Sequence, residues 1–206
     1  DHISGLQTLL KRCAAPVFTT ERAARELSWR LPGAETRLDA LDFGIPQSIG
    51  EFAVTAFPTS HDAPGSCGFR LDAAGGAVGV LTDTGYVTDE AADILEGVDL
   101  AVLEANHDIE TLRSGPYPYY LKQRILGAQG HLSNEDAARF AAVLAQSGTS
   151  EIILAHLSRE NNTPAMAQTA VERALSAAGV SPLLSVAPRD CLGPAHTVSR
   201  RSVCRR

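Results

Sequence analysis

The sequence predicts a layered α/β protein in which helices pack on β-sheets. Two observations lead to this prediction. Short β-branched or alternating segments first follow one another directly, and strand-like and helix-like segments then alternate along the rest of the chain. Neither a helix bundle nor a β-sandwich has this order of elements. Because no internal repeat or low-complexity linker interrupts the 206 residues, we expect one domain over 1–194, followed by a basic tail over 195–206.

The first half of the chain is expected to be mainly β-structure after two helices. Residues 3–12 have apolar residues at helical spacing, and residues 15–20 are typical of a short strand. A second helix is expected over 20–31, with Thr20 as its cap. Three strands, separated by Gly-rich turns, then follow at 49–57, 67–73 and 77–83.

The second half is expected to alternate between helices and strands. Residues 88–97 begin with Thr-Asp-Glu and end in Gly, which are the start and stop signals of a helix. Two more helices are predicted at 133–148 and 163–179, the second with a proline in its first turn. Apolar runs predict strands at 98–105, 151–158 and 183–188.

Composition limits the possible classes of protein only loosely. A net charge of −6 does not indicate a nucleic-acid-binding protein, but it does not exclude one whose basic groups are local. The longest apolar runs are too short to cross a membrane, so no membrane partner is expected. The cysteines are scattered, without a Cys-x-x-Cys motif, which favours a reducing, cytoplasmic setting. The Arg-rich tail is expected to be disordered, with phosphate binding as the alternative.

Histidines and carboxylates stand at the ends of several predicted strands. His61 follows AVTAFPTS, Asp83 ends GVLTD, Glu104 ends LAVLE and His156 ends IILAH, while His131 precedes a capped helix. Strand ends are where α/β proteins place their chemistry, because the rigid backbone positions side chains and the loops leave access. Taken singly, each of these residues is more often a hydrogen-bonded structural residue or a turn residue.

Together with Asp1 and His2, these residues form a set of imidazole and carboxylate ligands without a thiolate. Such a set suits Zn²⁺, Mn²⁺ or Fe²⁺ and does not suit Ca²⁺. A carboxylate between two groups of histidines can bridge two metal ions, an arrangement that activates water against phosphoesters. Asp83 lies between His61 and His156 in the sequence and is therefore the candidate bridge.

The order Asp1-His2, His61, Asp83, His156 resembles the metallo-β-lactamase fold, an αββα sandwich whose signature is His-x-His-x-Asp-His. The opening DHISGLQTLLKR resembles the end of that signature and the helix after it. The stretches TSHDAPGSCGF, LTDTGY, LEANHD, GHLSNEDAA, LAHLSRENNTP and SVAPR resemble its YycJ/WalJ-type branch, which is related to ribonuclease Z. The resemblance extends to about Arg189. The leading His-x-His pair and the strands expected before it are missing from the chain.

This resemblance implies a site for two divalent metal ions, zinc or manganese. Asp1, His2 and His156 match the ligands of the second ion, His61 matches the third ligand of the first ion, and Asp83 matches the bridging carboxylate. The lack of His-x-His implies that half of the first ion's ligands are absent. We therefore expect the chain to be a fragment that is inactive as it stands and poorly soluble, because missing strands would leave a sheet edge unpaired.

The resemblance also implies catalytic roles and an activity. Asp1 matches the residue that assists the attacking water, and Glu104 and His131 match a relay in which His131 protonates the leaving oxygen. The implied enzyme is a metal-dependent phosphodiesterase acting on nucleic acid, with DNA exonuclease activity favoured. The alternatives are a hydrolase of small esters, thioesters or lactams on the same fold, and an inactive metal-binding or scaffold member.

Other residues near these motifs have two interpretations each. His107 and Asp108 either support the site or belong to a capped loop, and His196 is expected to be solvated in the tail. The three tyrosines of YPYY are expected to pack over a helix, with base stacking as the alternative. Three residues at or just after the end of the predicted 151–158 strand are either structural or in contact with a phosphate: Ser158, Arg159 and Asn161.

Overall fold

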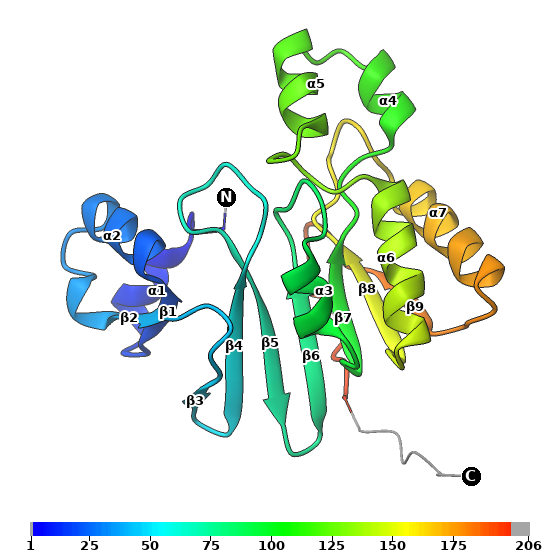
Figure 1. Ribbon diagram of the computed structural model, residues 1–206. Helices are drawn as coiled ribbons and strands as arrows, with labels where there is room; N and C mark the ends of the chain where they lie inside the picture. Colours follow the sequence, from blue (N-terminus) through cyan, green and yellow to red (C-terminus); the bar gives the residue numbers. More distant parts are fainter. Residues whose placement is uncertain (1, 199–206) are drawn as a thin grey trace.

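A computed structural model of the protein describes residues 2–198. Its strands are β1 (Val17–Thr20), β2 (Leu38–Leu41), β3 (Gln47–Ile49), β4 (Phe52–Pro58), β5 (Cys67–Ala73), β6 (Gly76–Leu81), β7 (Leu100–Glu104), β8 (Glu151–Ala155) and β9 (Leu183–Val186). Its helices are α1 (Leu6–Arg12), α2 (Glu21–Arg30), α3 (Asp89–Leu95), α4 (Ile109–Ser114), α5 (Tyr119–Leu126), α6 (Asn134–Gln146) and α7 (Pro164–Ala177), with a short 3₁₀ helix at Glu35–Arg37. Figure 1 shows these elements in layers.

The strands β3 to β9 form one seven-stranded sheet in sequence order, and β1 and β2 form a small parallel pair. Neighbours from β3 to β6 are antiparallel, whereas β6 to β9 are parallel and are joined by helical connections. Parallel strands joined in this way bring their carboxyl ends to the same edge of the sheet. This mixed α/β architecture confirms the predicted fold class.

Two apolar clusters lie on opposite faces of the large sheet. On one face, alternate strand residues such as Phe57 and Leu103 pack against α3, α6 and α7, which cover this face in Figure 1. On the other face, Val54 and Ala56 of β4 pack with Leu41 of the small sheet. Ala56 and Phe57 are neighbours in the chain and are both fully buried, because successive side chains of a strand point to opposite faces.

The residues that the sequence predicted as helix starts cap their helices in the structure. The side chains of Thr20, Thr88, Ser133 and Thr163 each accept a hydrogen bond from the backbone N–H three residues later. Pro164 occupies the first turn of α7, where its missing N–H needs no partner. These local signals therefore fixed the starts of α2, α3, α6 and α7.

The sequence did not predict β2, β3, α4, α5 or the short 3₁₀ helix. The two strands have only four and three residues, too few to show an alternating pattern. Asp108 is a cap, as one of its two interpretations had it, but it caps the helix α4 and not a loop: its side chain accepts a hydrogen bond from Thr111 N–H. The expectation that the tyrosine cluster packs over a helix was wrong for Tyr119 and Tyr120, which begin α5 and remain 77% and 74% exposed.

The tail is described only as far as residue 198. His196 is not simply solvated, because its Nδ1 lies 2.5 Å from Oε1 of Glu151. Residues 199–206 lie outside the described part of the chain, and the boundary at 194 stays a prediction. Among the described helices, none combines the length and the apolar composition needed to span a membrane.

Candidate metal centre

The predicted site residues meet at the edge formed by the carboxyl ends of β4, β6, β7 and β8. Most lie on the loops that follow those strands or precede α6, and His2 lies just before α1. The structure brings six of them together: His2, His61, Asp83, Glu104, His131 and His156. Asp1 lies outside the described residues.

Asp83 is at the centre of this group. Its Oδ2 lies 2.6 Å from Nε2 of His2, and its Oδ1 lies 3.5 Å from Nε2 of His61 and 3.7 Å from Nε2 of His156. Burial alone would raise the pKa of Asp83, but the hydrogen bond from His2 and the charges of the other histidines lower it to about 2. The two carboxylate oxygens thus face different histidines, which is the arrangement expected of a bridging ligand.

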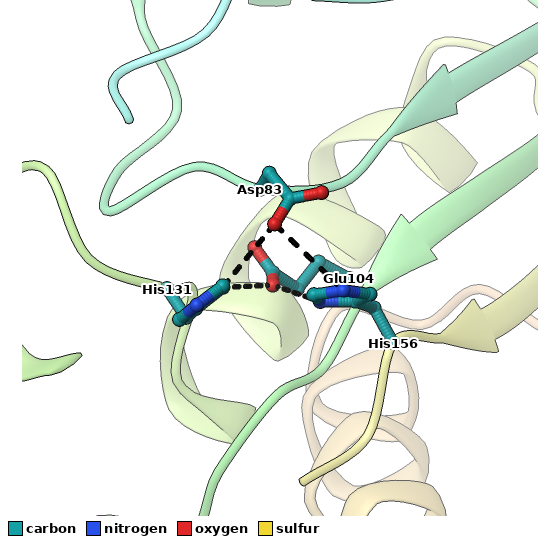
Figure 2. A group of neighbouring side chains, drawn as sticks. All are labelled: Asp83, Glu104, His131 and His156. Atoms are coloured by element: carbon teal, nitrogen blue, oxygen red, sulfur yellow. Dashed lines mark hydrogen bonds and ion pairs between the residues drawn. The ribbon is translucent and has the colours of Figure 1, made fainter. Parts of the chain in front are cut away.

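Three histidines have Nδ1 held by an acceptor behind the site. His61 Nδ1 donates to the carbonyl of Gly130 at 2.9 Å. His131 and His156 both donate from Nδ1 to Oε1 of Glu104 at 2.8 Å, as Figure 2 shows. A hydrogen bond of this kind fixes the tautomer and leaves Nε2 to face a metal ion or a substrate.

Glu104 is the shared support of the two imidazoles. It is fully buried, and its Oε2 accepts hydrogen bonds from the backbone N–H groups of Thr84 and Leu132 at 3.0 and 3.2 Å. Burial alone would raise its pKa, but the hydrogen bonds from His131 and His156 outweigh burial, so the pKa lies below its ordinary value. A carboxylate with these partners holds both imidazoles in place.

The backbone is left-handed at two of the site residues. Asp83 has φ of 54° and His156 has φ of 59°, and no other non-glycine residue in the described chain has a positive φ. Aspartate and histidine tolerate this conformation better than most residues, and it turns each side chain sharply at the end of its strand. Asn106 holds the second turn, because its Nδ2 donates to the carbonyl of His156 at 2.9 Å.

Buried asparagines tie together the loops that carry the site. Nδ2 of Asn162 donates to the carbonyls of Ala105 and Asn106 and to Oδ1 of Asn134. Oδ1 of Asn162 accepts in return from Nδ2 of Asn134 at 3.0 Å. The segments after β7 and β8 and the start of α6 are thereby joined in one network, which is strong only while every member has its partners.

We expect Asn134→Ala to lower the free energy of unfolding by about 1–3 kcal/mol, because Asn162 would lose a donor and an acceptor inside the protein. Urea denaturation measures this change. The matched control is Gln146→Ala at the exposed end of the same helix, which should stay within about 0.5 kcal/mol of the unsubstituted protein. Equal effects from the two substitutions would show that the network adds nothing to stability.

The donor chemistry of the site fits a divalent metal ion. Imidazole nitrogens with their tautomer fixed and the carboxylate of Asp83 are ligands typical of zinc and manganese. Asp83, Glu104, His131 and His156 each offer a ligand atom, and these atoms lie within 4.8 Å of one another. His61 and His2 extend the group around Asp83. The residues therefore fit a divalent metal ion.

Other candidates lie close to the site. His107 is buried, and neither of its ring nitrogens has a hydrogen-bond partner within the described residues. Burial lowers the pKa of His107 to about 4, so the ring is neutral. Ser158 N–H donates to the carbonyl of Asn106, and its hydroxyl accepts from Asn161 N–H, so both residues shape the loop after β8.

A cavity of about 1010 Å³ opens beside the histidines. His61, His131 and His156 form one part of its lining, and Tyr117 of the segment before α5 forms another.

The sequence did not identify Gly130, Thr84 or Asn106, whose backbone or amide groups hold the site side chains. No local pattern marks them, because each acts through a hydrogen bond to a residue distant in the sequence.

The sequence that builds this site matches a known family. The model of the beta-lactamase superfamily domain matches residues 1–157, which include every candidate metal ligand and the Glu104–His131 pair. The chain belongs to the beta-lactamase superfamily. Two curated relatives are similar over most of the chain: exodeoxyribonuclease YycJ of Bacillus anthracis and exodeoxyribonuclease WalJ of Streptococcus pneumoniae.

The first relative is 35% identical over 182 residues, which cover 87% of this chain and 68% of that protein. The second is 37% identical over 181 residues, which cover 86% of this chain and 67% of that protein. Among solved structures, the metallo-beta-lactamase fold protein YhfI from Bacillus subtilis matches with a TM-score of 0.66 and 20% identity. The match covers 90% of this chain and 70% of that one. The likeness to YhfI supports the superfamily fold, and the two relatives support the YycJ/WalJ-type resemblance.

Proposed function

We propose that this member of the beta-lactamase superfamily is a metal-dependent phosphodiesterase that hydrolyses nucleic acid, with DNA as the favoured substrate. The observation that carries the proposal is the pair of hydrogen bonds that Glu104 accepts from His131 and His156. One carboxylate thereby orients a candidate metal ligand and a candidate general acid at the same edge of the sheet. Relatives named as exodeoxyribonucleases support DNA as the substrate.

The proposed metal ligands are His2, His61, Asp83 and His156, with Asp1 added from the sequence. Their support is the position of Asp83, which lies within 3.7 Å of all three imidazoles. Two divalent ions, zinc or manganese, would supply Lewis acidity toward a phosphate and lower the pKa of water when bound. By its match to the family motif, Asp1 is also the proposed partner of the attacking water.

The proposed general acid is His131. Glu104 accepts from its Nδ1, so the proton to be transferred is the one on Nε2, and the acceptor is the oxygen that leaves phosphorus. Transfer converts the imidazolium to the neutral ring and keeps the Nδ1–H bond to Glu104 unchanged. His131 also lines the cavity, which places it where a substrate can approach.

The cytoplasm is the proposed location. The three cysteines in the described residues, Cys13, Cys67 and Cys191, form no disulfide with one another, which is typical of proteins in a reducing compartment.

We expect end-labelled DNA to be degraded in the presence of Mn²⁺ or Zn²⁺ and to survive when EDTA is added. The 206-residue chain is assayed beside a version extended upstream of Asp1. RNA, a nitrophenyl ester and a chromogenic lactam are assayed in parallel. Hydrolysis of the ester or the lactam without hydrolysis of DNA or RNA would contradict the proposal, as would DNA hydrolysis that persists without metal.

A further inference from the structure

The cavity beside the site has an unusual charge for this protein. The whole chain has 24 acidic and 18 basic residues, yet the cavity lining contains three arginines and no aspartate or glutamate among the described residues. The three arginines are Arg124, Arg159 and Arg189. A cleft lined by one sign of charge concentrates ligands of the opposite sign. The cavity is therefore suited to an anion.

Two of these arginines already have carboxylate partners. Arg124 pairs with Asp62 at 2.6 Å, and Arg159 pairs with Asp190 at 3.1 Å. Arg189 has no carboxylate within salt-bridge distance in residues 2–198, and its Nη2 donates to the carbonyls of Leu157 and Ser158. Since a guanidinium has five N–H donors, Nε and Nη1 of Arg189 remain for a phosphate.

The cavity also has an apolar wall. Leu121 and Ile125 are four residues apart in α5, so they lie on one face of that helix, and both line the cavity. Tyr117, in the segment before α5, lines it as well. Val186 lines it from the end of β9, and Pro188 lines it from the segment that follows. A ligand that uses both surfaces needs a flat apolar part and an anionic part, and a nucleotide has both.

Both walls are fixed to the metal centre. On the α5 side, Ser60 Oγ donates to the carbonyl of Ala128, and His131 N–H donates to the carbonyl of Ile125. A Cβ on Gly130 would lie only 2.1 Å from that carbonyl, so the turn after α5 is closely packed against the His131 loop. On the other side, Ala187 N–H donates to the carbonyl of Leu154 at 2.8 Å.

We propose that this cavity is the channel that admits a single-stranded end of the nucleic-acid substrate, with a base stacked on Tyr117 and a backbone phosphate bound by Arg189. The proposal rests on the proposed nuclease function and adds the form of the substrate and the residues that hold it. An unpaired strand is required because the bases of a duplex stack on one another and cannot reach a side chain. Aromatic side chains combined with a positively charged groove are typical of single-strand binding.

The test is the binding of a fluorescent oligothymidine to the 206-residue chain in EDTA, which separates binding from catalysis. Tyr117→Ala should weaken binding about 5- to 150-fold, the loss expected when one base no longer stacks, and should leave the salt dependence unchanged. The matched control is Tyr119→Ala. Tyr119 lies two residues away, is 77% exposed and does not line the cavity, so its removal should leave binding unchanged.

Arg189→Ala should reduce the slope of log Kd against log salt by about 0.7, the contribution of one phosphate contact on a single strand. Arg173→Ala on the exposed surface of α7 is the charge-matched control and should leave the slope unchanged. A blunt duplex of the same length should compete more weakly than the single strand. Thermal melting of each variant shows whether the fold is retained.

Three results would overturn the channel: no binding of oligothymidine at low salt, an equal loss from Tyr117→Ala and Tyr119→Ala, or competition by the duplex as strong as by the single strand. Each of these leaves the nuclease proposal intact if metal-dependent DNA hydrolysis is found in the separate assay. The reverse result, binding as expected without any hydrolysis, would overturn the nuclease proposal and with it the role of the channel in catalysis.

Discussion

His131→Ala is expected to lower the turnover of DNA by about 10²–10⁴-fold, the range typical of a lost general acid, while metal content stays the same. The reason is the geometry of the relay. Glu104 fixes His131 through Nδ1, so Nε2 is the ring nitrogen that can donate, and His131 lines the cavity where the leaving oxygen would lie. The measurement is made on whichever form of the protein degrades DNA, the 206-residue chain or the version extended upstream.

A nitrophenyl phosphodiester distinguishes an acid from a structural role. Its leaving group needs no proton, so His131→Ala should slow its hydrolysis much less than the hydrolysis of DNA. His196→Ala is the control, since that histidine pairs with Glu151 away from the site. An equal loss on both substrates would show that His131 binds substrate or supports the fold instead of donating a proton.

Asp83→Ala is expected to lose the metal that the unsubstituted protein retains through gel filtration. The loss of affinity should exceed the 10–100-fold that changes to residues behind the ligands typically cause, because both oxygens of Asp83 face histidines of the site. Elemental analysis of the purified proteins measures the metal content. Asp83→Asn is analysed as well, because it removes the charge with little change in shape.

The control for Asp83 is Asp62→Ala. Asp62 is also close to the site, with Oδ1 3.7 Å from Nε2 of His61, but it faces Arg124 with both of its oxygens. Loss of metal from Asp83→Ala and not from Asp62→Ala would support a ligand role. Equal metal content in the Asp83 variants and the unsubstituted protein would contradict the assignment of Asp83 as the bridge.

The sequence by itself determined the elements whose signals are local. Thr88 and Ser133 were recognised as caps because a cap bonds to a backbone group three residues away. Strands β6 and β8 were recognised from apolar runs, and the residues that end or follow them, Asp83 and His156, were predicted as site residues for that reason. Parallel strands bring such ends to one edge, so the meeting of these residues also followed from the order of elements.

Only the tertiary structure decided how the site is held and what lies beside it. Glu104 joins His131 to His156, and Gly130 holds His61 from 69 positions away along the chain. No local pattern encodes such pairs, because their partners are chosen by the packing of loops that meet only in the fold. For the same reason, nothing in the sequence separates Tyr117, which lines the cavity, from Tyr119, which is exposed: their difference depends on where α5 packs.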